Sequence, residues 1–393
     1  MREVTGLDGR TFSPLAQDRI VLAAAETHSY ARAELMLDVL SGIEISSRQI
    51  NRLTDETGRA LREEQQQRVV LHERKKLDVD VQNIPELAVV ETDGGRVRTR
   101  EANMGPGTHQ PAWKESKTAL FMRMTSETHA DDPASEPPES LQNRAYVGQL
   151  MQQMAGAAAA TTEEGATAAA ASKSVDASRS GPKYESPTRL MRTCLASLDP
   201  SSQFGKLMAA EAHRKGFYKA NRKAFVADGM KCNWTIWKKH FPSFVPVVDF
   251  IHVISYVYRA ALAIGESEEF GWGLYADWMR SCWQGRVEEV IAELTDWLSG
   301  QPPLPDDIPD DDPREVVRRS MVYLTNNRER MHYPDYRCQG LPMTSTLMES
   351  LIKEMNYRVK GTEKFWNNPN GANHILAVKA AALSDDGRLT PQR

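Results

Sequence analysis

The chain has 393 residues, of which 40% are hydrophobic and 26% charged, and its formal net charge is −4. This is the composition of a globular protein with room for a sizeable core and one or two smaller modules. The four cysteines form no C-x-x-C pair, which argues against a zinc ribbon or a disulfide framework. No run approaches the roughly 18 apolar residues of a membrane span, and the first residues lack the apolar stretch of a signal peptide, so we expect a cytoplasmic protein that does not enter membranes.

The charges are unevenly distributed along the chain, which matters because a net negative charge counts against nucleic-acid binding. Residues 301–313 hold five Asp and no Lys or Arg, whereas residues 202–243 carry nine Lys or Arg against Glu211 and Asp228 alone. A basic core with acidic connectors can still hold DNA locally.

The first 75 residues are predicted to be helical. After a glycine-containing turn, a capped helix is expected to begin at Ser46 or Ser47. Its first turns present four polar side chains, Arg48, Gln49, Asn51 and Arg52. Helices joined in this way suit a helix-turn-helix that reads the DNA major groove, so residues 1–75 are a candidate DNA-binding region. A helical bundle that only dimerises fits the pattern equally well.

Near Pro85 the hydrophobic period changes from helical to extended. Residues 86–101 are predicted as two strands joined around Asp93 and the two glycines after it, because Asp-Gly-Gly is a strong hairpin signal. Residues 118–126 are predicted as a third strand. We therefore assign residues 76–128 to the first part of a core sheet.

Residues 129–200 are expected to be a disordered insertion, since they are acidic and proline-containing at first and rich in Ala later. Residues 201–253 form the second part of the core, with a helix, a strand ending at Asp228, another helix and a strand ending at Asp249. The predicted order of elements is that of an RNase H-like fold: three strands, then a helix, a strand, a helix and a strand. The expected class is therefore α/β, with a mixed five-stranded sheet flanked by helices.

The rest of the chain is predicted to be mainly helical. Residues 254–335 are expected to form an all-helical insertion. Residues 336–383 hold a Thr- or Ser-capped helix that carries Glu349, followed by a C-terminal helix, and residues 384–393 are expected as a tail.

Three acids stand where metal-dependent phosphodiester chemistry would need them. Such chemistry uses two divalent ions about 4 Å apart, and Mg²⁺ needs only a few carboxylates. Asp93 and Asp228 end strands, and Glu349 lies one turn into the final helix. Each also has a plain structural explanation, because both aspartates precede glycines that favour turns and a helical Glu usually lies on the surface.

Two choices among the acids remain at this point. Glu349 has a rival in Glu354, but Lys353, Asn356 and Lys360 follow Glu349 on one helical face, which suits metal and phosphates better. Asp249 and His252 form a D-x-x-H pair, and Asp249 competes with Asp228 for the place of second ligand. We favour Asp228, because strand order puts it next to Asp93, and treat Asp249 and His252 as a supporting pair.

Several segments carry a resemblance to a known family. VVETDGG, VADG, VVDFIHV and the segment from Met348 to Leu383 resemble the DDE transposases of bacterial insertion sequences, and more distantly Mutator and hAT elements. The resemblance covers nearly the whole chain, and residues 333–383 are its most specific part. It implies that Asp93, Asp228 and Glu349 hold two Mg²⁺ or Mn²⁺ ions.

The resemblance also implies partners and further binding residues. The enzyme would nick double-stranded DNA at terminal inverted repeats and transfer the 3′-hydroxyl to target DNA, as a homodimer or larger assembly on the nucleoid. Near the site, DNA would be contacted by Lys353, Asn356, Arg358, Lys360, Lys364 and Trp366. For Trp366, and for Trp278 as a second stacking candidate, packing in the core is the commoner role.

One alternative comes from another functional class. A transposase-derived DNA-binding repressor, or an inactive copy, would keep the helices but no longer bind metal. The presence of all three acids favours the enzyme. A nuclease of the same fold without strand transfer fits the same residues.

Overall fold

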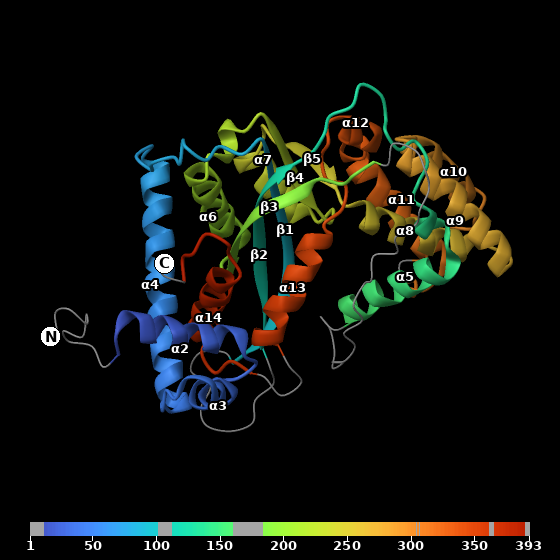
Figure 1. Cartoon of the computed structure of the whole chain (residues 1–393). Coiled ribbons are helices and arrows are strands. Elements are labelled where there is room, and N and C mark those ends of the chain that lie inside the picture. The colour runs from blue at the N-terminus through green and yellow to red at the C-terminus, as the bar shows by residue number, and fades with distance from the viewer. Residues whose placement is uncertain are drawn as a thin grey trace.

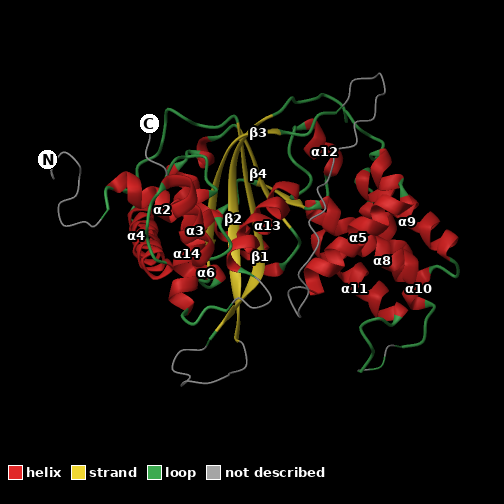
Figure 2. Cartoon of the chain, turned by 60° about the horizontal axis from the view of Figure 1, so that its bottom comes forward, coloured by secondary structure: helices red, strands yellow, loops and turns green. Residues whose placement is uncertain are grey.

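The computed structural model describes residues 12–100, 112–159, 184–303, 305, 307–360 and 365–389, with backbone alone for 155–159. A five-stranded sheet stands between two groups of helices (Figure 1). One group contains α2, α3, α4, α6 and α14, and the other contains α5 and α8 to α12 (Figure 2). In the part of the chain described, no helix is both long and apolar enough to cross a membrane.

The sheet has the strand order β3-β2-β1-β4-β5. Its strands are β1 (Leu87–Thr99), β2 (Ala112–Thr125), β3 (Thr188–Ser197), β4 (Arg222–Ala227) and β5 (Val245–Val248). β1, β2 and β3 pair antiparallel, whereas β4 and β5 run parallel to β1. Val89, Val90 and Val226 are fully buried, as expected for central strands covered on both faces. The predicted α/β class and the mixed five-stranded sheet are confirmed.

β1 is one long strand where a hairpin was predicted. It passes through Asp93, Gly94 and Gly95 without turning and stays paired with β2 as far as Thr99, opposite Ala112. The predicted turn at Asp93 is therefore wrong. Pairing with β2 along the whole length outweighs the local preference of Asp-Gly-Gly for a turn.

The third strand of the sheet lies in the segment that was expected to be disordered. Residues 129–200 contain η1 (Glu139–Gln142), α5 (Arg144–Ala159) and β3, whose residues Cys194 and Leu195 are buried. The prediction of disorder is wrong for these elements. The rest of the Ala-rich stretch, residues 160–183, lies outside the described residues.

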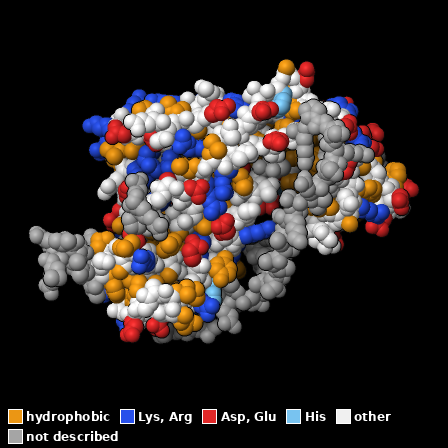
Figure 3. All heavy atoms as spheres, viewed as in Figure 1, with side chains coloured by type: hydrophobic (Ala, Val, Ile, Leu, Met, Phe, Trp, Pro, Cys, Tyr) orange, Lys and Arg blue, Asp and Glu red, His pale blue; other side chains and the backbone are white. Residues whose placement is uncertain are grey.

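The N-terminal helices pack on the core. They are α2 (Pro14–Glu26), α3 (Tyr30–Ser41) and α4 (Ser47–Glu73), and α4 packs against α6 (Ser201–Arg214) and α14 (Pro369–Ala382). Ser46 and Gln49 form the capping box that begins α4, and Ile50 is buried beneath it. On α3, Val39 and Leu40 stay 69% and 72% exposed, in a region where Figure 3 shows hydrophobic side chains gathered at the surface.

Of the remaining helices, η2 (Phe217–Lys219) and α7 (Lys231–His240) contact α6, and the others belong to the second group. These others are α8 (Phe250–Ile264), α9 (Glu268–Trp283), α10 (Val287–Ser299), α11 (Pro313–Asn327), η3 (Arg328–Arg330) and α12 (Tyr333–Cys338). α8 packs against α9 and α11 around buried side chains such as Tyr275 and Met279. α13 (Thr346–Val359) lies against β1 and β2, in front of the sheet in Figure 2.

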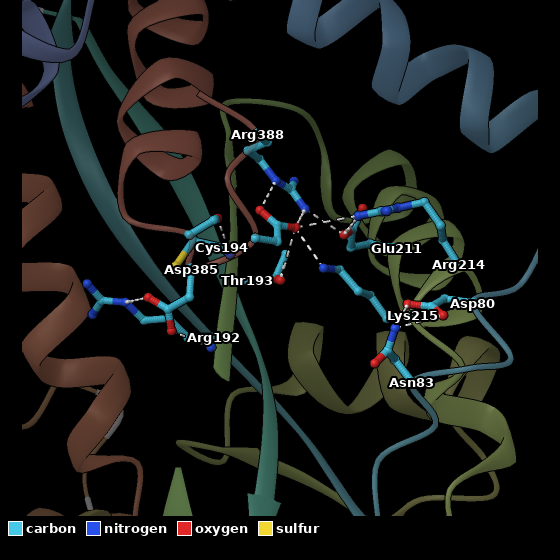
Figure 4. A network of polar contacts seen from close by, with 12 residues as sticks. Asp80, Asn83, Arg192, Thr193, Cys194, Glu211, Arg214, Lys215, Asp385 and Arg388 are labelled. Carbon is cyan, nitrogen blue, oxygen red and sulfur yellow. Dashed lines mark hydrogen bonds and ion pairs between the residues drawn. The ribbon is translucent and has the colours of Figure 1, made fainter. Parts of the chain in front are cut away.

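A polar cluster ties the segment after α14 to α6 (Figure 4). Arg388 Nη2 donates to Glu211 Oε1 over 2.8 Å and also bonds Asp386, while Lys215 Nζ donates to Asp386 Oδ2 over 2.7 Å. We call Glu211, Arg214, Lys215, Asp386 and Arg388 the C-terminal cluster. Its residues bind one another through ion pairs, so residues 384–389, expected as part of a tail, are packed.

The same segment covers the edge of β3. Asp385 N donates to the carbonyl oxygen of Arg192 over 2.9 Å, and the Asp385 side chain accepts from Arg192 N over 2.8 Å. Ser384 Oγ accepts from Cys194 N over 2.9 Å. The segment therefore supplies partners to an edge strand that would otherwise present free backbone groups.

Candidate active site

Three aspartates form a row where the parallel pairing of β1, β4 and β5 ends. The parallel pairings end with Thr92, Ala227 and Val248 side by side. The next residue on each strand is an aspartate: Asp93, Asp228 and Asp249. Neighbouring strands lie about 4.8 Å apart, so Asp93 and Asp228 are direct neighbours and Asp249 stands one strand further away.

α13 adds a fourth carboxylate beside this row. Burial and the charge of Asp249 raise the pKa of Glu349, while His252 and Lys353 oppose the shift. The competing Glu354 lies elsewhere, since its Oε1 is 3.3 Å from Nη1 of Arg192 on β3. Glu349, rather than Glu354, therefore lies with the aspartates.

Asp93 stands in an unbalanced negative environment. Burial and the charge of Asp228 raise the pKa of Asp93 to about 6, and Glu349 adds to the effect. The Gly94 N–H, 2.6 Å from Asp93 Oδ1, and the charge of His252 act in the opposite direction. Negative charge that raises the pKa of a carboxyl in this way favours a bound cation.

Asp228 is held by its own loop and by α11. Its Oδ1 accepts from Met230 N over 3.0 Å and from Asn233 Nδ2 over 2.9 Å, and its carbonyl oxygen accepts from the Tyr323 hydroxyl over 2.9 Å. Gly229 follows with φ +96, and a Cβ there would lie 2.6 Å from the Tyr323 ring. Only glycine fits this close approach, so the position of Asp228 is tightly defined.

Asp249 is fully buried and its oxygens are already engaged. It caps α8 by accepting from Ile251 N over 2.8 Å, and it also accepts from Ser345 Oγ and pairs with His252 Nδ1 at 3.1 Å. Burial lowers the pKa of His252. The hydrogen bond to Asp249 and the negative charges of Asp249 and Asp228 outweigh burial and raise this pKa to about 9. The D-x-x-H pair thus holds a cationic imidazole beside the acids.

Glu91 is a further acid that the sequence interpretation missed. It precedes Asp93 by two positions and so points to the same face of β1, where it is fully buried and accepts from the backbone N–H of Met348. Its Oε2 has no hydrogen-bond partner, and burial followed by the charge of Asp249 raises its pKa well above the usual range. A charged residue inside the buried run LAVVETD was the signal that could have revealed it.

The donor set suits a hard divalent cation. Across the described ranges, no three His, Cys, Asp or Glu side chains are already gathered as a metal site. Mg²⁺ does not require such a group, because it keeps several waters and takes one or two protein carboxylates. Asp93 and Asp228, with Glu349 beside them, supply that number of oxygen ligands and the negative charge that a cation would offset.

The DNA-contact residues predicted on α4 are at the surface. Arg48, Gln49, Asn51 and Arg52 are all exposed. Gln49 closes the capping box with Ser46, and Arg52 Nε lies 3.9 Å from Glu56 Oε1. Their side chains lie at the beginning of α4, where solvent reaches them.

The predicted contacts on α13 divide into two kinds. Lys353 is exposed and Asn356 half-buried. Lys360 lies near Asp93, since burial lowers its pKa and the charge of Asp93 opposes that change. Arg358 is 2% exposed, and its Nε donates to the carbonyl oxygen of Ala24 over 2.7 Å, so it fastens α13 to α2 instead of facing solvent where DNA phosphates would lie.

The tryptophans have structural contacts. Trp366 N donates to the carbonyl oxygen of Arg98 over 3.1 Å, and its indole N–H donates to the carbonyl oxygen of Val359 over 3.1 Å. Trp278 is buried and donates to Glu293. Lys364 lies outside the described residues.

Comparisons with known proteins give a remote structural likeness. No family model matches the chain, and no curated protein matches it. Among solved structures, the chain is similar to the Drosophila P element transposase strand transfer complex, with 10% identity, a TM-score of 0.37, and coverage of 99% of this chain and 96% of that chain. Similarity at this level assigns no residue a role.

Proposed function

We propose that the chain is a DDE transposase with an RNase H-like core, in which Asp93, Asp228 and Glu349 hold two Mg²⁺ or Mn²⁺ ions. The main support is the register of the sheet, in which Asp93 and Asp228 directly follow Thr92 and Ala227, the last parallel pair of β1 and β4. Glu349 on α13 joins them, and the order β3-β2-β1-β4-β5 resembles that of RNase H-like proteins.

The residues around the acids would position DNA for cleavage. Bound metal ions would activate the attacking oxygen and stabilise the leaving oxygen at the scissile phosphate. His252 stays protonated at neutral pH, since its pKa is raised to about 9, and so offers a charged donor to phosphate oxygens. Lys353 and Lys360 add positive charge along α13 beside the same acids.

Double-stranded DNA would be the partner of both halves of the molecule. The exposed side chains at the start of α4 would read the terminal inverted repeats, and the acidic site would join the cleaved 3′-hydroxyl to target DNA. Bringing two DNA ends together requires at least two protomers, so we propose a homodimer or larger assembly.

The decisive experiment is cleavage of DNA that carries the inverted repeats flanking the gene. With Mg²⁺, the wild type should nick these ends and join them to target DNA. Asp93→Asn, Asp228→Asn and Glu349→Gln should each lower the cleavage rate by about 100-fold or more, the scale of losing one preorganised electrostatic group. Glu354→Gln is the matched control on the same helix and should retain activity.

Each contrary outcome has its own meaning. Full activity after any of the three substitutions would remove that residue from the site. Binding without cleavage by the wild type would favour the alternative, a transposase-derived DNA-binding repressor or inactive copy. Cleavage without joining would favour a nuclease of the same fold.

A further inference from the structure

The first turn of α13 begins in an unusual way. Ser345 is its N-cap residue, and a serine there ordinarily accepts a hydrogen bond from the second or third backbone N–H of the helix. Here no such bond is present, because the buried Ser345 hydroxyl donates to Asp249 Oδ2 instead. The N-cap side chain is thus used to join two elements.

The role of cap passes to Glu91 on the neighbouring strand. The backbone N–H of Met348, which precedes Glu349, donates to the buried Glu91 carboxyl. Glu91 therefore fixes the turn of α13 that carries Glu349 to β1, the strand that carries Asp93.

A third tie connects the same turn to α8. Phe250 N donates to the carbonyl oxygen of Met343 over 2.9 Å, just before α13 begins, and Asp249 caps α8 while accepting from Ser345. The start of α13 is therefore anchored to β1 and to the end of β5, the two strands that flank β4 in the sheet order.

We infer that Glu91, Asp249 and Ser345 are positioning residues that form a clamp on the first turn of α13 and so set the place of Glu349 relative to Asp93 and Asp228. The importance of this placement for catalysis rests on the proposed function, whereas the clamp itself can be tested by a structural measurement. None of the three needs to touch DNA or metal for this role.

Two matched pairs of full-length variants test the clamp. Ser345→Ala removes the hydroxyl that reaches Asp249, whereas Thr346→Ala removes an exposed hydroxyl one residue later. Glu91→Met removes the acceptor for Met348 N–H with little change in volume, whereas Glu91→Gln keeps an acceptor. Ser345→Ala and Glu91→Met should change both readouts below, and Thr346→Ala and Glu91→Gln should stay near wild type.

The first readout is amide hydrogen exchange of residues 346–352, measured by mass spectrometry without DNA or metal. Exchange should become faster in Ser345→Ala and Glu91→Met than in their controls. Wild-type exchange in both would overturn the clamp. This readout does not depend on catalysis. If the wild type failed to cleave DNA, the proposed function would be contradicted, but the exchange rates would still show whether the clamp exists.

The second readout separates positioning from binding. In Ser345→Ala the cleavage rate at saturating DNA should fall by about 10- to 100-fold, the cost of a displacement of about 1 Å, and the Mg²⁺ concentration for half-maximal rate should rise. DNA affinity should stay unchanged. Faster exchange with an unchanged cleavage rate and Mg²⁺ requirement would show that the clamp does not position Glu349, and would overturn the inference.

Discussion

The acids at the strand ends and the C-terminal cluster are both partly buried polar groups, but their electrostatics are opposite. At the strand ends, burial and the charge of Asp228 raise the pKa of Asp93 to about 6. In the C-terminal cluster burial acts in the same direction, yet Arg388 and Arg214 overcome it and lower the pKa of Glu211 to about 2. The two regions differ in whether the positive charges that the chain supplies outweigh burial: at Asp93 the charge of His252 does not, whereas at Glu211 those of Arg388 and Arg214 do.

This difference separates a stabilising cluster from a candidate binding site. A buried carboxylate with its cations in place favours folding, and removing one partner leaves an uncompensated charge. A carboxylate whose cations do not offset burial and neighbouring negative charge lowers stability, and it persists where function requires it. Asp93 matches the second description, and a bound cation would add the positive charge that His252 alone does not supply.

The largest effect is expected from breaking the C-terminal cluster. Arg388→Met leaves Glu211 buried without its main cation and should lower the free energy of unfolding by about 3–5 kcal/mol in urea denaturation. Arg286→Met, which breaks an exposed pair with Glu289, is the control and should cost less than about 1 kcal/mol. Equal losses in the two variants would contradict the assignment of the cluster as a stabilising one.

Low pH should remove the stabilising contribution of Glu211 in the same cluster. The pKa of Glu211 is lowered from 4.5 to about 2 on folding, so its contribution is fully present above pH 4.5 and is lost as the pH falls toward 2. That contribution corresponds to about 3 kcal/mol. Unfolding free energies measured across this range should show the loss in the wild type, and Glu211→Gln should flatten it.

Asp93→Asn should stabilise the protein, the opposite of the effect expected for Arg388→Met. Without divalent ions, Asp93→Asn should raise the free energy of unfolding by about 1–2 kcal/mol above pH 6, because the ionised Asp93 carboxylate destabilises the fold there. Below pH 3.8, the pKa of Asp93 in the unfolded chain, the substitution should have no effect, because the carboxyl is protonated in both states. Mg²⁺ at about 100 times its Kd should stabilise the wild type by about 2.7 kcal/mol and leave the variant unchanged. Calorimetry with and without Mg²⁺ measures both effects, and destabilisation by Asp93→Asn would speak against charge crowding.

The smallest effect concerns the tie between α11 and Asp228. Tyr323→Phe removes the hydroxyl that donates to the Asp228 carbonyl oxygen and should cost about 1 kcal/mol. The ring stays stacked on Tyr256, with 3.8 Å between ring centroids, so helix packing should persist. Tyr256→Phe changes the other ring of the pair and should be nearly neutral in the same denaturation assay.

Much of the fold could be predicted because its signals are local. The apolar runs of β4 and β5, each followed by an aspartate, indicated both strands and the position of Asp228. β3 escaped notice because it is an edge strand, and its arginines, such as Arg189 and Arg192, obscure the hydrophobic alternation.

The parts of the site that depend on distant contacts could not be predicted. Helical spacing placed Arg358 on a basic face, but its burial comes from Ala24 and Tyr30, more than 300 residues earlier. The position of Glu91 in an apolar run marked it as unusual, but its neighbours Met348 and Asp249 come from distant parts of the chain. Short-range periodicity contains no information about such pairings.

The covering of β3 by residues 384–389 has a consequence for synthesis on the ribosome. Arg192 and its partner Asp385 are separated by 193 positions, which at typical translation speeds corresponds to about 10–40 s. During that interval the nascent sheet presents an open edge to other polypeptides in the cell. Substitutions in the covering segment should therefore appear first as aggregation of newly made protein, before any change in the folded protein is detected.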